Sequence, residues 1–219
     1  MSKNPFDPLF EDLPESLPIF PLEGVLLLPQ GDLPLNIFEP RYIAMVDDVL
    51  RGNRLIGMIQ PSGCTAANGP AIFSTGCAGR ITQFQETEDG RYLLNLRGLC
   101  RFRVEEELPL LHGYRRVKTD WTSFGPDMEH MGCPDLDRAE LNQILKVFFE
   151  QHGLTVSWAL IEDIPNDGLV TALAMVCPLS PSEKQALLEA PCCQTRANLL
   201  FKILDLSVHH SFHGCLSEH

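Results

Sequence analysis

The chain has 219 residues and a formal net charge of −12, which argues against a nucleic-acid-binding surface, since such surfaces are usually basic. Its 44% hydrophobic content is sufficient for a folded core and excludes wholesale disorder. We find no apolar run near the roughly 18 to 20 residues that span a bilayer, and no signal peptide. We therefore expect a cytoplasmic protein without membrane contact.

The first part of the chain predicts an arm, three strands and a helix. Residues 1–16 are rich in proline and acidic residues, which indicates a flexible N-terminal arm. Short apolar runs separated by prolines and turns predict buried strands over 17–22 and 24–29. A further strand over 33–37 leads directly into an amphipathic helix over 40–50, where apolar residues recur every three or four positions.

The next part carries the clearest strand signals. A strand is predicted over 54–60, and the Gly-, Ser- and Asn-rich residues 61–70 predict a flexible loop. Two runs over 79–85 and 92–96 flank Asp89-Gly90, a preferred turn pair, and therefore predict a hairpin.

Strict alternation continues after this hairpin. The predicted core face carries Cys100, Phe102 and Val104, and the predicted solvent face carries Arg101, Arg103 and Glu105. A last strand is predicted over 114–121. Many short strands with a single helix favour a small, partly closed β-barrel subdomain over 17–124.

The period of the apolar residues becomes helical after Ser123-Phe124-Gly125-Pro126, which we interpret as a boundary. We expect a bundle of four or five short helices over 125–208. Its sharpest signal is Ser180-Pro181-Ser182-Glu183, a capping box with proline at the first helical position. The last helix is predicted over 196–206, and residues 209–219 are expected to form a disordered tail.

Two long stretches carry a resemblance to a known family. They run from Ile19 to Tyr42, including Leu33-Pro34-Leu35-Asn36-Ile37-Phe38-Glu39-Pro40-Arg41-Tyr42, and from Gly76 to Val104. In this order and at this distance they resemble the N-terminal, substrate-binding domain of Lon proteases, and the likeness extends over 17–208. The resemblance implies an α+β fold, a PUA-like β-pseudobarrel followed by a helical bundle. It also implies a role in engaging unfolded or tagged polypeptides.

The chain lacks the motif that the Lon ATPase requires. No Gly-x-x-x-x-Gly-Lys-Ser/Thr loop is present, and no Gly-Lys dipeptide occurs at all. The resemblance places the Ser-Lys peptidase dyad in a domain beyond this chain. We therefore expect a standalone, non-enzymatic binding module without a cofactor.

Other groupings favour structure over chemistry. The acidic runs Asp47-Asp48 and Glu105-Glu106-Glu107 are expected to be solvated faces rather than acid–base pairs. The eight cysteines include no C-x-x-C pair, so we expect reduced, mostly buried thiols and no metal site. A zinc or nickel site in the His- and Cys-rich residues 209–215 is the alternative to a disordered tail.

The resemblance assigns polypeptide contact to the turn Glu39-Pro40-Arg41. An exposed acid, a rigid turn and an arginine fork suit recognition of peptide groups or charges. The alternative is that Glu39 and Arg41 only cap and pin the helix, and Pro40 departs from many protease sequences.

The partners we expect are unfolded or tagged polypeptides, and through them a protease or chaperone, as for an adaptor or accessory in protein quality control. The alternative function is a PUA-like small-molecule or RNA-binding module, although the acidic balance disfavours nucleic acid.

Overall fold

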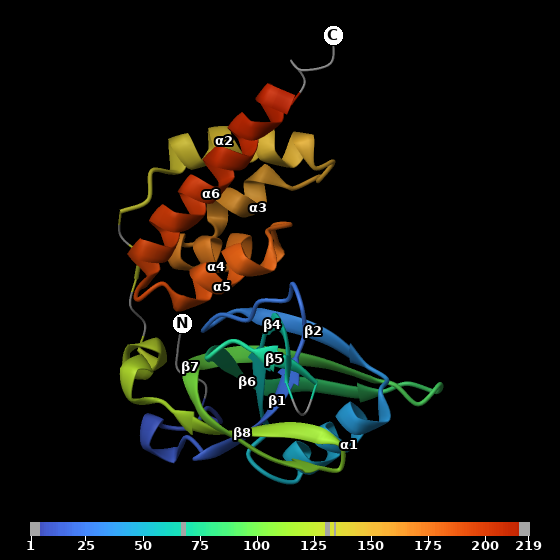
Figure 1. The fold of residues 1–219 in the computed structure, drawn as a ribbon. Coiled ribbons are helices and arrows are strands. Elements are labelled where there is room, and N and C mark those ends of the chain that lie inside the picture. Colours follow the sequence, from blue (N-terminus) through green and yellow to red (C-terminus); the bar gives the residue numbers. More distant parts are fainter. Residues whose placement is uncertain (1–4, 67–68, 130–131, 134, 215–219) are drawn as a thin grey trace.

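Strands make up the first half of the chain and helices make up most of the second half (Figure 1). The computed structural model describes residues 5–66, 69–129, 132–133 and 135–214, apart from the side chains of 64–66 and 210–214. The predicted α+β class is confirmed. The helical bundle lies on one side of a barrel of strands, and α1 (Pro40–Leu50) lies beside the strands.

Five strands close into a ring that runs β7–β6–β3–β1–β8 and returns to β7, with β2 added to β7. The strands are β1 (Ser16–Pro21), β2 (Asp32–Ile37), β3 (Leu55–Ile59), β6 (Thr75–Glu86), β7 (Tyr92–Leu111) and β8 (Tyr114–Asp120). All pairs are antiparallel except β1 with β3. The ring closes because β7, at 20 residues, is long enough to pair with β6 and β2 along its first half and with β8 along its second.

Alternation along the strands separates two hydrophobic clusters. The inner cluster receives side chains from every strand of the ring, among them Leu17, Ile19, Leu55, Ile59, Ala78, Phe102 and Val117. Gly76 makes room for the Phe102 ring, because a Cβ there would lie 2.6 Å from the ring edge. The outer cluster contains Phe20, Ile56 and Met58 from the opposite strand faces, together with residues of α1 and of the helical bundle.

Five helices in the described chain form the predicted bundle. They are α2 (Arg138–Gln151), α3 (Trp158–Asp163), α4 (Asn166–Val176), α5 (Pro181–Glu189) and α6 (Cys193–Gly214), and the 3₁₀ helices η1 (Phe10–Asp12) and η2 (Thr122–Met128) flank the ring in sequence. The predicted capping box of α5 is confirmed, since Ser180 and Glu183 each bond to the other's backbone N–H. Asp137 similarly caps α2 by accepting a hydrogen bond from the backbone of Glu140 at 3.0 Å.

Arg101 joins the barrel to the bundle. The sequence pattern predicts it on a solvent face, but the residue is only 4% exposed. Its guanidinium makes two bonds of 2.7 and 2.8 Å to the Asp127 carboxylate. It also donates to the carbonyl oxygens of Leu188 and Ala190, at 3.0 and 2.6 Å, where α5 ends. The prediction was wrong because the outer face of β7 is covered by the bundle at this point, and the last carbonyls of a helix need donors from outside it.

Further polar bonds hold α5 on the barrel. The Gln185 side chain donates to the Thr75 carbonyl at 3.1 Å, and the Gln60 side chain donates to the Pro181 carbonyl at 3.0 Å. The Lys184 ammonium donates to the Gly24 carbonyl at 2.8 Å. Burial lowers the pKa of Lys184. Its ammonium group donates to carbonyl oxygens rather than to a carboxylate.

The N-terminal arm is packed against the barrel, in contrast to the predicted flexible arm. Asp7 forms an ion pair with the buried Arg80 at 2.7 Å. The Pro14 carbonyl accepts hydrogen bonds from the Thr119 hydroxyl and the Trp121 indole, at 2.8 and 2.9 Å. Asp7 and Pro14 therefore make specific contacts with the barrel. A composition rich in proline and acidic residues does not show that such contacts exist. Residues 1–4 lie outside the described residues.

Three other expectations differ from the structure. Residues 24–29 are largely buried but do not form a strand. Residues 61–70 contribute to a two-stranded hairpin, β4 (Pro61–Ala66) with β5 (Gly69–Ile72), rather than to a loop. Helix α6 continues to Gly214, into the predicted tail, because neither proline nor glycine interrupts 207–213; residues 215–219 are not described.

We expect Arg101→Met to lower the free energy of unfolding by about 3 kcal/mol, because it leaves the Asp127 carboxylate buried without its cation. Urea unfolding followed by tryptophan fluorescence measures the change. Arg103→Met is the matched control, since Arg103 lies on the same strand with an exposed side chain and should cost under about 0.5 kcal/mol. Equal losses in the two variants would contradict the role of Arg101.

Candidate functional site

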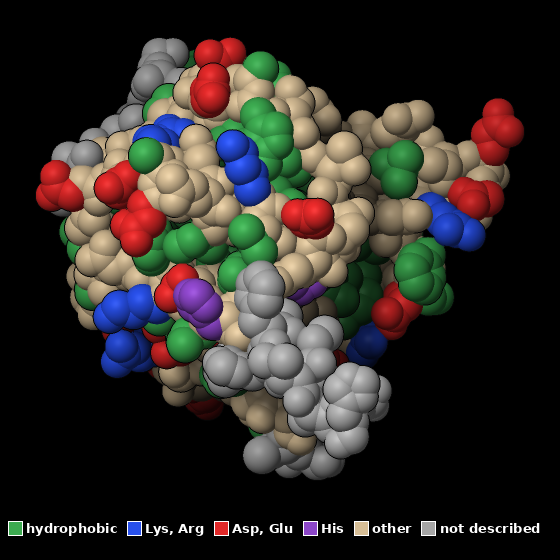
Figure 2. All heavy atoms as spheres, turned by 90° about the horizontal axis from the view of Figure 1, so that it is seen from above, with side chains coloured by type: hydrophobic (Ala, Val, Ile, Leu, Met, Phe, Trp, Pro, Cys, Tyr) green, Lys and Arg blue, Asp and Glu red, His purple; other side chains and the backbone are tan. Residues whose placement is uncertain are grey.

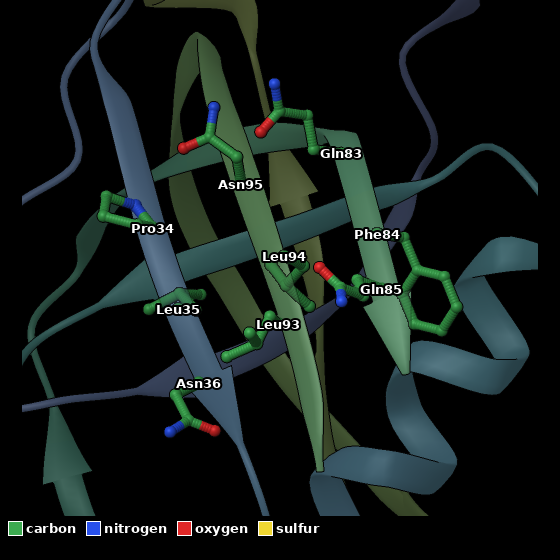
Figure 3. Close-up of a pocket in the computed structure, with 9 residues that line it drawn as sticks. All are labelled: Pro34, Leu35, Asn36, Gln83, Phe84, Gln85, Leu93, Leu94 and Asn95. Carbon is green, nitrogen blue, oxygen red and sulfur yellow. The ribbon is translucent and has the colours of Figure 1, made fainter. Parts of the chain in front are cut away.

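A shallow groove of about 470 Å³ crosses β2, β7 and β6 (Figure 3). Nine residues line it: Pro34, Leu35, Asn36, Gln83, Phe84, Gln85, Leu93, Leu94 and Asn95. None of them is charged, and four carry carboxamide side chains. The groove can therefore donate and accept hydrogen bonds without a net charge of its own.

The strand register places the carboxamides on one face of the sheet. Asn36 lies opposite Leu93, which lies opposite Gln85 on the next strand. In the same way Pro34 lies opposite Asn95, which lies opposite Gln83. Directly opposed residues point to the same side of an antiparallel pair. Figure 3 shows the carboxamides of Asn95 and Gln83 rising together on that side.

These carboxamides differ in their partners. The Asn95 side chain donates to Asp32 and to Thr82, at 3.1 and 3.2 Å. Within the described part of the chain, the side chains of Asn36, Gln83 and Gln85 have no hydrogen-bond partner. Their donors and acceptors thus face solvent and are free to bind a ligand.

Large apolar side chains are exposed at the groove and beyond the end of β2. Phe84 is 37% exposed on the opposite face of β6 from the carboxamides, where it packs edge-on against the Tyr92 ring with a centroid distance of 4.9 Å. Leu93 is 40% exposed. Phe38, directly after β2, is 64% exposed, and the Arg91 guanidinium lies 5.9 Å from its ring centroid. The groove therefore continues into an aromatic side chain beside the turn between β6 and β7.

The predicted contact turn follows Phe38 directly. Pro40 opens α1, as expected, and Arg41 forms an ion pair with Glu39 at 2.8 Å, both side chains being about half exposed. The Arg41 guanidinium also lies 4.6 Å from the Tyr42 ring centroid. Glu39 occupies the N-cap position but makes no side-chain cap bond, so the capping part of the alternative interpretation is wrong. Binding of polypeptide by Glu39, Pro40 and Arg41 stays a prediction.

Carboxylates anchor α1 to the strands. Asp47 accepts a hydrogen bond from the Tyr92 hydroxyl at 3.0 Å, which ties the helix to β7. Asp48 bonds to the Tyr114 hydroxyl at 2.9 Å and to the His112 ring at 2.8 Å. The expectation of a purely solvated acidic face is therefore wrong, because the sequence does not show which strand tyrosines lie beside the helix.

The pKa values of this cluster reflect its hydrogen bonds. Burial raises the pKa of Tyr114 to about 12, and the bond to Asp48 adds to the rise. For Asp48, burial acts to raise the pKa, but the bonds from His112 and Tyr114 outweigh it and hold the pKa below the ordinary value of 3.8.

Other kinds of site find less support in the described residues. They contain no group of three His, Cys, Asp or Glu side chains that could hold a metal ion. Of the proposed tail ligands only the His209 side chain is described, and it pairs with Asp205 at 3.3 Å. Figure 2 shows Lys and Arg side chains scattered among acidic and hydrophobic ones on the face that it presents, without one basic patch.

Most of the described cysteines are buried, as expected. Cys77, Cys100, Cys133 and Cys177 are buried free thiols, and Cys192 is exposed. The side chain of Cys64 and residue Cys215 lie outside the described part of the chain. Among the helices that the structure describes, none combines the length and apolar character needed to cross a bilayer.

A family model for the ATP-dependent protease La (LON) substrate-binding domain matches residues 16–205. The chain belongs to the Lon substrate-binding domain family. This match confirms the resemblance predicted from the sequence, and it covers the barrel together with most of the bundle.

Full-length Lon proteases contain much more than this domain. The chain is 28% identical over 202 residues to Lon protease 2 of Myxococcus xanthus, across 89% of this chain and 24% of that protein. It is 37% identical over 101 residues to the Lon protease of Dictyoglomus thermophilum, across 45% of this chain and 12% of that protein. The chain thus spans at most about a quarter of the length of these relatives.

Solved structures support the same fold. A Lon N-terminal domain protein from Xanthomonas campestris is similar with a TM-score of 0.56 and 28% identity, covering 85% of this chain and 97% of that one. The N-terminal domain of Lon protease from the Mycobacterium avium complex is similar with a TM-score of 0.58 and 16% identity, covering 87% and 98%. The second similarity shows the fold alone.

The sequence predicted the turn Glu39-Pro40-Arg41 as a candidate site, but it did not predict the groove. A signal was present, because polar amides occupy every second position in Gln83-Phe84-Gln85, and Pro34 and Asn36 also alternate with apolar residues. The pairing of β2 with the hairpin, which brings these positions together, is not visible in any one segment.

We expect Tyr114→Phe to raise the pKa of Asp48 toward 3.8, because one hydrogen bond to the ionised carboxylate is lost. The stability that this bond provides, about 1 kcal/mol, is present above the ordinary carboxyl pKa and is lost as the pH falls through the lower folded-state value. NMR titration of the carboxyl carbons measures the shift.

Tyr92→Phe is the control for this titration, since Tyr92 bonds to Asp47 and not to Asp48. An Asp48 pKa that stays unchanged in Tyr114→Phe would refute the assigned bond. A shift of equal size in both variants would do the same.

Proposed function

We propose that this chain is a non-catalytic polypeptide-binding module, an adaptor or accessory in protein quality control that presents unfolded or tagged polypeptides to a protease or chaperone. The observation that carries the proposal is an uncharged, amide-lined groove with exposed apolar side chains on a member of the Lon substrate-binding domain family. Family membership supports a substrate-binding role, and the groove supplies the chemistry for a peptide ligand.

Peptide groups match the groove better than other ligands do. Each peptide unit offers one N–H donor and one carbonyl acceptor, and a carboxamide side chain can pair with both. The exposed part of Leu93, on the same face as the carboxamides, would bury apolar side chains, which are abundant in unfolded chains and scarce on the surfaces of folded ones. The module would thereby distinguish unfolded from folded polypeptides.

The groove is suited neither to binding RNA nor to catalysing a reaction. A site that follows a phosphate backbone needs Lys or Arg, and the lining residues include none. The same residues include no side chain that titrates near neutral pH and no nucleophile, so the groove is suited to binding rather than to turnover.

We expect Leu93→Ser to weaken the binding of reduced, carboxymethylated α-lactalbumin roughly tenfold, because it removes exposed apolar area from the groove. Biolayer interferometry with immobilised chain measures the affinity, and native α-lactalbumin serves as the folded comparison. Leu206→Ser on α6 is the matched control, since Leu206 is also exposed, at 57%, but lies outside the groove.

The proposed function fails if the unfolded protein binds no better than native α-lactalbumin. It also fails if single-stranded RNA binds in a low-salt filter assay while the unfolded protein does not, a result that would favour the RNA-binding alternative.

We expect Arg41→Ala to weaken binding of acidic tagged peptides several-fold while the unfolding midpoint changes little, because an exposed ion pair contributes under about 1 kcal/mol to stability. Fluorescence anisotropy with labelled peptides and thermal unfolding measure the two effects. A lower unfolding midpoint with unchanged affinity would instead support the interpretation that Glu39 and Arg41 only pin α1.

A further inference from the structure

β2 lies at an edge of its sheet, with β7 as its neighbour on one side. The Gly98 backbone N–H donates to the Gly31 carbonyl at 2.8 Å, immediately before the pair Asp32–Arg97. In an antiparallel ladder this bond makes Asp32–Arg97 a non-hydrogen-bonded pair, and the pairs then alternate. The peptide groups of Leu33, Leu35 and Ile37 therefore point to β7, and those of Asp32, Pro34 and Asn36 point away from it.

The outward peptide groups are available. No group in the described part of the chain makes a hydrogen bond to the backbone of Asp32, Pro34 or Asn36 on that side. The side chains of these three residues are exposed. Pro34 has no N–H, so the edge offers two donors, on Asp32 and Asn36, and three carbonyl acceptors.

We propose that an extended polypeptide segment binds by adding a strand to the outer edge of β2. The proposal rests on the proposed function and specifies how the polypeptide is held. Backbone hydrogen bonds to an edge strand are largely independent of the bound sequence, which suits a module that engages many unfolded chains. One end of the edge is Gly31, which packs closely against Met175 of α4, since a Cβ on Gly31 would lie 2.3 Å from the Met175 side chain. The other end is the exposed Phe38.

The neighbouring groove identifies the occupant as a polypeptide. An added strand would place alternate side chains on the face that carries Pro34 and Asn36, next to the Asn36 carboxamide; Leu93 and Asn95 of β7 lie one strand further along this face, and Gln83 and Gln85 of β6 lie two strands further. The Asn36 carboxamide is uncharged and has no hydrogen-bond partner in the described chain, so it complements the polar groups of a peptide and not a phosphate or a charged surface.

A second copy of the chain fits the edge less well. Two copies related by a two-fold axis would pair their β2 strands antiparallel. With the axis at the centre of the strand, Pro34 would face its own equivalent, and both hydrogen bonds donated by that central pair would be missing. A formal charge of −12 on each copy adds repulsion.

The hydrogen-bond pattern can be tested on the peptide while the protein stays unchanged. The probe is a fluorescein-labelled peptide of about ten residues, chosen as the tightest-binding segment of carboxymethylated α-lactalbumin on a peptide array. Each backbone amide is N-methylated in turn, and the affinity for the full chain is measured by fluorescence anisotropy. We expect a roughly tenfold loss at alternate amides and little change at those between them, since only every second N–H of an added strand faces β2.

A protein variant gives the complementary test. Asn36→Pro removes one of the two outward donors, and Asn36→Ala is the matched control that keeps the N–H while removing the carboxamide. We expect Asn36→Pro to bind the peptide several-fold more weakly than Asn36→Ala, with circular dichroism confirming that both are folded. The N-methyl series does not depend on the folding of either variant.

The outcomes separate this inference from the proposed function. If the peptide binds but N-methylation shows no alternation, edge addition is wrong and the groove alone accounts for binding. If neither the peptide nor carboxymethylated α-lactalbumin binds, the proposed function fails as well. If sedimentation shows a dimer that Asn36→Pro dissociates, and alternation is absent, a second copy occupies the edge and the inference is overturned.

Discussion

The buried guanidinium of Arg101 fixes how the two halves of the molecule meet. Hydrophobic packing between barrel and bundle is non-directional and would tolerate sliding. A buried guanidinium does not tolerate such sliding, because its donors have a fixed geometry and each donor left unpaired in the interior costs free energy. Its partners are the Asp127 carboxylate and the carbonyls at the end of α5, so this side chain ties the end of α5 to one position on β7. Gln185 and Lys184, on the same helix, donate further hydrogen bonds to the carbonyls of Thr75 and Gly24.

The candidate site lies on a part of the barrel that the ring itself does not require. β2 and the outer ends of β6 and β7 add to a ring that closes through β7 and β8. Substitutions on the exposed face of this extension therefore leave the inner cluster untouched. The Glu39–Arg41 pair stands at the end of the same extension, held in place through α1 by the tyrosines that bond to Asp47 and Asp48. The groove, the free edge and the turn thus share one rigid support.

Local signals in the sequence were sufficient for several elements. Pro40 at the start of α1, Asp89-Gly90 in the hairpin and the capping box at Ser180 each depend on residues within one segment, and each was predicted. Arg101 and the N-terminal arm were not, because their partners lie 26 or more residues away in sequence, such as Asp127 for Arg101. The groove was missed for the same reason. Its residues come from three strands whose pairing is decided by the whole barrel, whereas the predicted turn is a single stretch of chain.

The pairing of β1 with β8 determines the order in which this chain can fold. Leu17 lies opposite Val117, so the ring cannot close until the chain has been synthesised through β8. Contacts of such long sequence separation form slowly, because the entropy of closing a large loop must be lost first. The helical bundle combines neighbours that are close in sequence, such as α5 and α6, with the packing of its first helix α2 on its last helix α6. Both sequence separations are shorter than that between β1 and β8, so the bundle is free to form more quickly. During synthesis the apolar strand β1 therefore spends time without β8, and a nascent chain of this module resembles for a while the unfolded polypeptides that it is proposed to bind.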